Sequence, residues 1–146
     1  MEKKFIDLWE KNKNKLEDYF RNTEQREYDD YKLIVKKIVE LVINDSDIDS
    51  KNYDADSITV VDDGSYQGTQ IFLIPRDICQ PYENDYIFTH NYYGSCSGCD
   101  TLQAIHYYKT GKPNEEQIKD YMTLSLHLVQ QLRYLIPREN KDGEDK

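Results

Sequence analysis

The spacing of the apolar residues changes twice along the chain, and this limits the possible folds more than any other feature. Residues 1–43 follow the helical spacing of about 3.6 residues, residues 58–91 contain short β-branched runs between turn residues, and residues 101–135 return to helical spacing. Helices at both ends with strands between them predict an α+β domain, in the order α-α-β-β-β-α-α.

About four helices are expected from apolar stripes in otherwise charged sequence. Asp100 with Gln103, and Asn114 with Gln117, have the spacing of capping boxes, which place the starts of the last two helices. The expected helices cover roughly residues 2–21, 24–43, 101–108 and 115–135.

Three strands are expected in the middle of the chain, at Ile58–Val61, Thr69–Ile74 and Tyr86–Asn91. The first two predict a hairpin, because Gly64 and Gly68 in the loop between them can both take positive φ. The sequence therefore predicts a small antiparallel sheet of about three strands packed with the helices. We expect a single domain over residues 1–136 and a charged, flexible tail over 137–146.

The chain is acidic, and the acidity is confined to its middle. It carries 28 Asp and Glu against 19 Lys and Arg, a net charge of −9. Residues 1–44 hold ten acidic and ten basic side chains, and residues 101–146 hold seven of each. Residues 45–100 hold eleven acidic and two basic side chains, which accounts for the whole surplus. A general nucleic-acid binder would need a basic face instead, so we expect no direct binding of nucleic acid.

The sequence is typical of a protein of the reducing cytosol. Its three cysteines are too few for a disulfide scaffold, the first residues have no apolar signal-peptide core, and no apolar run approaches the length of a membrane span. We therefore expect a cytoplasmic location, no membrane contact and no cofactor.

A cysteine turn lies between the third strand and the third helix. Its candidate binding residues are Tyr93, Ser95, Cys96, Ser97, Cys99 and Asp100. A Cys-x-x-Cys pair at a helix start can supply a stabilised thiolate for redox chemistry. The pair could instead bind zinc together with Cys79 and His90, although these spacings match no usual zinc finger. The favoured interpretation is a structural turn with small buried cysteines.

Alternating carboxylates after the second helix have the spacing of a calcium loop. The weak candidate ligands are Asp45, Asp47, Asp49 and Asp56. However, Ser50 stands where such a loop needs Gly, and a strand rather than a helix is expected next. A solvated connector is the favoured interpretation.

The hairpin loop is the second place where Gly, Ser, Asp and Tyr cluster. Its candidate binding residues are Asp62, Asp63, Ser65, Tyr66 and Gln67. An ordinary hairpin tip would have similar composition. If the hairpin pairs with the third strand, this loop and the cysteine turn would lie at one end of the sheet.

The two loops also carry a family resemblance. The segments Asp-Gly-Ser-Tyr-Gln-Gly at 63–68 and Tyr-Gly-Ser-Cys-Ser-Gly-Cys-Asp-Thr-Leu-Gln-Ala at 93–104 resemble a family of small, mostly uncharacterised proteins of bacteriophages and bacterial mobile elements. The resemblance covers residues 57–108. Because the family has no established activity, it implies a phage-type source and a cytosolic setting, and no catalytic role is carried over.

These observations favour a non-enzymatic binding protein of phage type. The acidic middle would engage a basic surface of a host or phage protein, with nucleic-acid mimicry and an anti-defence role as possible forms, and the many tyrosines suit interface anchoring. Acidity that only maintains solubility is an equally weighted interpretation. The alternative function is a small thiol- or metal-dependent enzyme or module centred on the cysteine turn.

Overall fold

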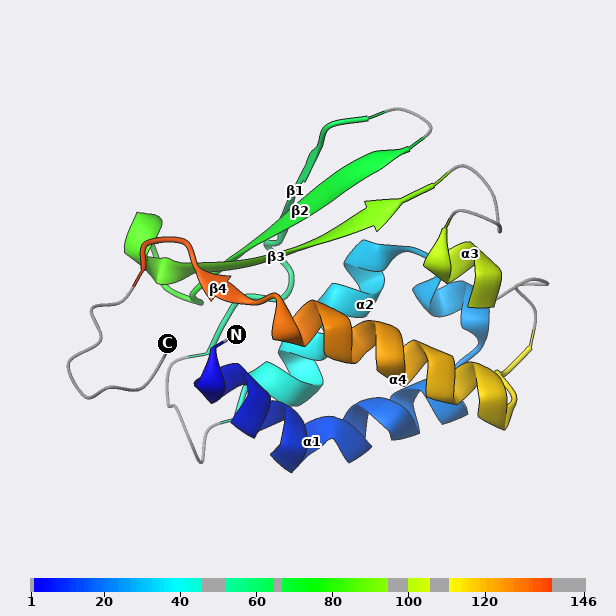
Figure 1. Ribbon diagram of the computed structural model, residues 1–146. Helices are drawn as coiled ribbons and strands as arrows, with labels where there is room; N and C mark the ends of the chain where they lie inside the picture. The colour runs from blue at the N-terminus through cyan, green and yellow to red at the C-terminus, as the bar shows by residue number, and fades with distance from the viewer. Residues whose placement is uncertain (1, 46–51, 65–66, 95–99, 106–110, 138–146) are drawn as a thin grey trace.

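The computed structural model describes residues 2–45, 52–64, 67–94, 100–105 and 111–137. A helical layer lies against one face of an antiparallel sheet (Figure 1), so the expected α+β class is confirmed. The elements are α1 (Lys3–Asn22), α2 (Tyr31–Ile38), β1 (Thr59–Asp62), β2 (Gly68–Pro75), β3 (Tyr86–Tyr93), α3 (Thr101–Ile105), α4 (Glu115–Gln130) and β4 (Arg133–Tyr134).

The helical layer is held together by an aromatic cluster. The ring centroids of Phe20 and Tyr28 lie 4.9 Å apart, and the ring of Tyr121 on α4 lies 5.2 Å from Phe20 and 5.0 Å from Tyr28. The Tyr121 hydroxyl donates to the Gln25 side chain at 2.7 Å. Tyr31 and Tyr53 are also buried, so these four tyrosines are core residues rather than interface anchors.

The prediction of a single helix over roughly residues 24–43 is wrong. A 3₁₀ turn (Gln25–Tyr28) comes first, and α2 begins only after Asp30, whose carboxylate accepts from the backbone N–H groups of Lys32 and Leu33. A short polar side chain at this position satisfies helix amides and starts a new helix. After Ile38 the chain continues through a π-helical turn (Val39–Ile43).

The sheet has the strand order β1-β2-β3-β4, with every neighbouring pair antiparallel. The three expected strands are present, each extended or shifted by one or two residues. The fourth strand was not expected. α4 ends at Gln130 rather than near residue 135, and the chain then pairs Tyr134 with Ile87 and Arg133 with Phe88.

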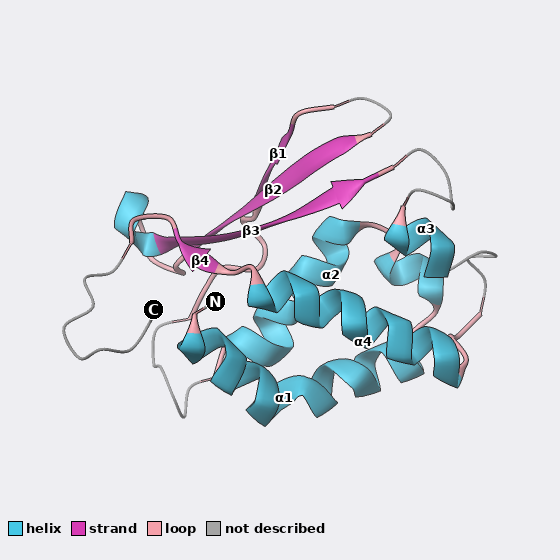
Figure 2. Ribbon diagram, in the orientation of Figure 1, coloured by secondary structure: helices cyan, strands magenta, loops and turns pink. Residues whose placement is uncertain are grey.

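Alternate residues of the strands face the helices. Phe72, Ile74 and Ile87 are fully buried there, and Thr89 donates from its hydroxyl to the carbonyl of Leu128 on α4 at 2.7 Å. None of the four α-helices covers the opposite face of the sheet (Figure 2). That face therefore meets solvent in the described part of the chain.

The expected helix caps are confirmed for α4 and only half confirmed for α3. Asn114 and Gln117 bond reciprocally, side chain to backbone, at 2.8 and 2.9 Å. Asp100 accepts from the backbone of Gln103 at 3.1 Å, and the Gln103 side-chain amide donates to the Gly94 carbonyl at 3.2 Å.

Parts of the expected architecture lie outside the described residues. They are residues 106–108 of the third helix and residues 138–146 of the charged tail. Of the helices that the structure describes, none combines the length and apolar character needed to cross a membrane.

Candidate functional site

Strand pairing brings the hairpin loop beside the end of β3, as the sequence led us to expect. Gly68 pairs with Tyr93, and the Tyr93 hydroxyl donates to a carboxylate oxygen of Asp62 at 2.6 Å. The Gln70 side chain donates to the other oxygen of Asp62 at 3.2 Å. Three strands thus contribute polar side chains to one end of the sheet.

The hairpin loop is closed by its two aspartates. Asp62 accepts from the backbone of Gly64 at 2.9 Å, and Asp63 accepts from the backbone of Thr69 at 2.7 Å. The expectation of positive φ at Gly64 and Gly68 is wrong, because neither glycine has a φ in the left-handed region. Both positions favour glycine because neighbouring atoms lie close to them. A side chain at Gly64 would collide with the Gln67 carbonyl, and one at Gly68 would crowd Asp63.

Asp100 is the junction between α2, β3 and α3. Its buried carboxylate accepts from the Tyr31 hydroxyl at 2.7 Å, from the Gly94 backbone at 2.9 Å and from the Gln103 backbone at 3.1 Å. The Tyr31 hydroxyl accepts in turn from the backbone of Leu102 at 3.0 Å. Burial and the Asp100 carboxylate raise the pKa of Tyr31, so its phenol stays protonated.

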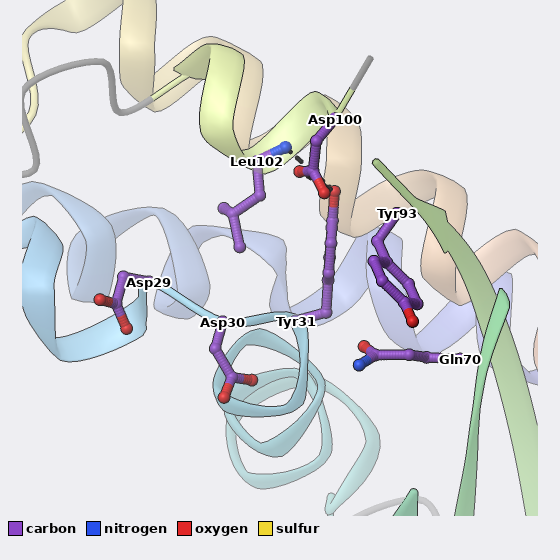
Figure 3. A pocket seen from close by; sticks show the side chains of 7 residues that line it. All are labelled: Asp29, Asp30, Tyr31, Gln70, Tyr93, Asp100 and Leu102. Carbon is purple, nitrogen blue, oxygen red and sulfur yellow. Dashed lines mark hydrogen bonds between the residues drawn. The ribbon is translucent and has the colours of Figure 1, made fainter. Parts of the chain in front are cut away.

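A pocket of about 220 Å³ lies between this junction and the end of the sheet. In Figure 3, Tyr93 and Gln70 stand on the sheet side of Tyr31, and Asp100 and Leu102 lie at the start of α3. The lining residues are Asp29, Asp30, Tyr31, Gln70, Tyr93, Asp100 and Leu102.

Of these lining residues, only Tyr93 and Asp100 are predicted from the sequence as site residues. The consecutive Asp29 and Asp30 were the available signal for the others, because an Asp before a helical stripe marks a helix start. The predicted continuous helix over residues 24–43 runs through both aspartates and so hides the helix start that the structure shows there.

Carboxylates gather at this end of the molecule without basic partners. We call Asp29, Asp30, Asp62, Asp63 and Asp100 the acidic end; among the described residues, none of the five forms an ion pair with Lys, Arg or His. Some acidic residues elsewhere do form ion pairs, as Asp56 does with Lys36 at 3.0 Å.

The hydrogen bond between Asp62 and Tyr93 shifts the pKa values of both side chains. The Tyr93 hydroxyl, followed by the Gly64 backbone and Gln70, lowers the pKa of Asp62 below its ordinary value. The same hydrogen bond raises the pKa of Tyr93 to about 12. Near neutral pH, Asp62 is therefore a carboxylate and Tyr93 a neutral donor that orients it.

The two candidate calcium ligands that the structure describes, Asp45 and Asp56, bond to different partners. Asp45 is buried, where it accepts from the Asn12 side chain at 2.9 Å and pairs with Lys11 at 3.1 Å. Asp56 is exposed and pairs with Lys36 of α2. Asp47 and Asp49 lie outside the described residues.

The candidate zinc ligands include Cys79, which is exposed in the segment after β2, and His90, which is exposed on β3. Cys96 and Cys99 lie outside the described residues, as do the binding candidates Ser65, Tyr66, Ser95 and Ser97. Gln67 is exposed at the start of β2. The described ranges contain no group of three or more His, Cys, Asp or Glu side chains placed to hold a metal ion.

Comparison of the chain with protein-family models, with curated proteins and with solved structures found no match.

Proposed function

We propose that this chain is a non-enzymatic binding protein whose acidic end engages a basic surface of another protein. The observation that carries the proposal is the grouping of four exposed carboxylates at the acidic end, Asp29, Asp30, Asp62 and Asp63, which form no ion pair among the described residues. Like charges held together repel one another, and a cationic partner relieves this repulsion.

The rigidity of the acidic end supports recognition of a partner rather than a purely solubilising role. Asp62 is oriented by Tyr93 and Gln70, Asp63 by the backbone of Thr69, and Asp30 by the first turn of α2. Side chains that are already ordered lose less conformational entropy when a partner binds. Solubility requires no such ordering.

The partner that fits this surface is a host or phage protein with a basic face in the bacterial cytosol. A nucleic-acid-binding protein of the host presents such a face, and ordered carboxylates can occupy the positions of phosphates there. In that form, the chain would act by nucleic-acid mimicry against host defence.

Affinity capture from a nuclease-treated bacterial lysate tests the proposal. The test variant is Asp62→Asn with Asp63→Asn, because amide oxygens can still accept the loop hydrogen bonds while both charges are removed. The matched control is Glu116→Gln with Asp120→Asn, which removes two exposed charges from α4.

We expect a basic protein to be retained by the wild type and by the α4 control, and to be lost with the hairpin variant. Raising the salt concentration should release it, because exposed charge pairs are screened. Retention that is indifferent both to salt and to the hairpin charges would refute the proposal.

A further inference from the structure

Among the strands that the structure describes, none pairs with the outer edge of β1. The Asp63 N–H donates to the Thr69 carbonyl at 3.2 Å, so residues 63 and 69 form a hydrogen-bonded pair. Hydrogen-bonded and non-hydrogen-bonded pairs alternate along an antiparallel ladder. Val60 and Asp62, which pair with Phe72 and Gln70, therefore direct their N–H and C=O groups away from β2.

This edge lacks three of the features that block strand addition in other proteins. β1 is the terminal strand of the sheet, and Thr59, Val61 and Asp62 are exposed. Natural edge strands are commonly protected by Lys, Pro or a bulge. Residues 52–64 contain no Lys, Arg, His or Pro, and the register of β1 with β2 is continuous.

The solvent-facing side of the sheet offers apolar surface beside the same edge. Val61 is 47% exposed, and its register neighbour Ile71 is only partly buried. Further along β3, Tyr92 is 54% exposed on this face. A strand added to β1 would place alternate side chains next to Val61 and extend this apolar surface.

The negative charge around β1 favours a basic partner strand over a second copy of the chain. Residues 52–64 carry four carboxylates, Asp54, Asp56, Asp62 and Asp63, and no basic side chain; of the four, Asp56 is paired with Lys36. A second copy of the chain would bring the same four carboxylates into the interface and add a further net charge of −9. Cross-strand pairs of opposite charge are favourable, whereas like charges directly opposite are not.

We infer that β1 binds an extended, basic segment of the partner protein as an additional strand. This inference rests on the proposed function and specifies how the partner is held. Backbone hydrogen bonds to Val60 and Asp62 provide the strand register, and basic side chains of the added strand lie beside Asp62 and Asp63.

Amide hydrogen exchange, measured by NMR on the labelled protein, tests the inference with three peptides. The first alternates Arg and Val. The second has the same sequence with every backbone amide methylated, so that it keeps the charge, but its N-methyl groups remove the donors and keep its backbone too far from β1 to pair as a strand. The third alternates Glu and Val and controls for strand propensity without positive charge.

We expect the Arg–Val peptide to slow exchange of the Val60 and Asp62 amides by about tenfold or more, because they become hydrogen-bonded. The methylated and acidic peptides should leave both rates unchanged. The Asp62→Asn, Asp63→Asn variant should weaken binding of the Arg–Val peptide, whereas the α4 control should not.

Three results would overturn the inference. Equal binding of the first two peptides with unchanged Val60 and Asp62 exchange would show charge attraction without strand addition, and the proposed function would stand. No binding of the Arg–Val peptide would reject strand addition, while lysate capture would still decide the proposed function. Protection of both amides without peptide, in a protein that sediments as a dimer, would assign the edge to a second copy.

Discussion

At the scale of single residues, the carboxylates of the acidic end have two different roles. Asp62 and Asp63 are exposed and close a loop, so their charges face solvent. Asp100 is buried and accepts three hydrogen bonds, from the Tyr31 hydroxyl on α2, the Gly94 N–H after β3 and the Gln103 N–H on α3. The same residue type is thus exposed to solvent in one place and part of a buried hydrogen-bond network in the other.

Replacement of Asp100 should be costly for stability. Asp100→Ala leaves the Tyr31 hydroxyl and the Gly94 and Gln103 amides without their acceptor. We expect a loss of about 3 kcal/mol in the free energy of unfolding, measured by urea denaturation, because buried bonds to charged groups are among the strongest. Asp63→Asn is the control and should change stability by less than about 0.5 kcal/mol. A similar small loss for Asp100→Ala would contradict its role as a junction.

The Tyr93–Asp62 hydrogen bond predicts a pH dependence. The pKa of Tyr93 is raised to about 12 in the folded protein, compared with about 10 in an unfolded chain. A raised pKa means that the contribution to stability is complete below pH about 10 and is lost as the pH rises to about 12.

Ultraviolet difference titration of the wild type against Tyr93→Phe should isolate this phenol and report a pKa near 12. Asp62→Asn should bring the pKa back toward 10, whereas Glu116→Gln should leave it raised. A Tyr93 phenol that ionises near pH 10 in the wild type would mean that the hydrogen bond is absent in solution.

At the scale of elements, local sequence signals explain the strands and caps better than the helix lengths. The Asn114 cap could be predicted because both of its hydrogen bonds join residues three apart. β4 could not, since Arg133 and Tyr134 continue a helical stripe and become a strand only by pairing with β3. The π-helical turn after Ile38 has no local signal either, because Val39–Ile43 fits the helical stripe equally well.

The α4 cap allows a quantitative test at this scale. Asn114→Ala removes the acceptor for the Gln117 N–H and should lower the free energy of unfolding by about 1 kcal/mol. Asn114→Asp retains an acceptor and should stay close to the wild type. Thermal or urea unfolding of the two variants measures the difference, and equal stability would mean that α4 does not depend on this cap.

At the scale of the whole molecule, the order of helices and strands was enough to predict an α+β domain and the meeting of the hairpin with the end of β3. The pocket was not predictable in full. The pocket forms because the helix is interrupted at Asp29 and Asp30. This interruption lets Tyr31 contact Asp100, which lies sixty-nine residues away in the sequence. Such contacts depend on packing between elements and leave no periodic pattern in the chain.

The distribution of charge is also a property of the whole molecule. On the helices, several acidic side chains pair with basic ones, as in Lys3 with Asp7 and Lys37 with Glu40. At the acidic end they do not pair within the described residues. The grouping of these carboxylates at one end of the sheet, rather than the net charge, distinguishes this surface of the molecule.

The central claim is that this surface binds a cationic partner, and the salt dependence of the affinity tests it most directly. Calorimetric titration with the purified, captured partner should show an affinity that falls as salt rises, with a shallower fall for Asp62→Asn, Asp63→Asn and an unchanged fall for the α4 control. If the hairpin variant keeps the affinity and salt dependence of the wild type, the acidic end is not the binding surface.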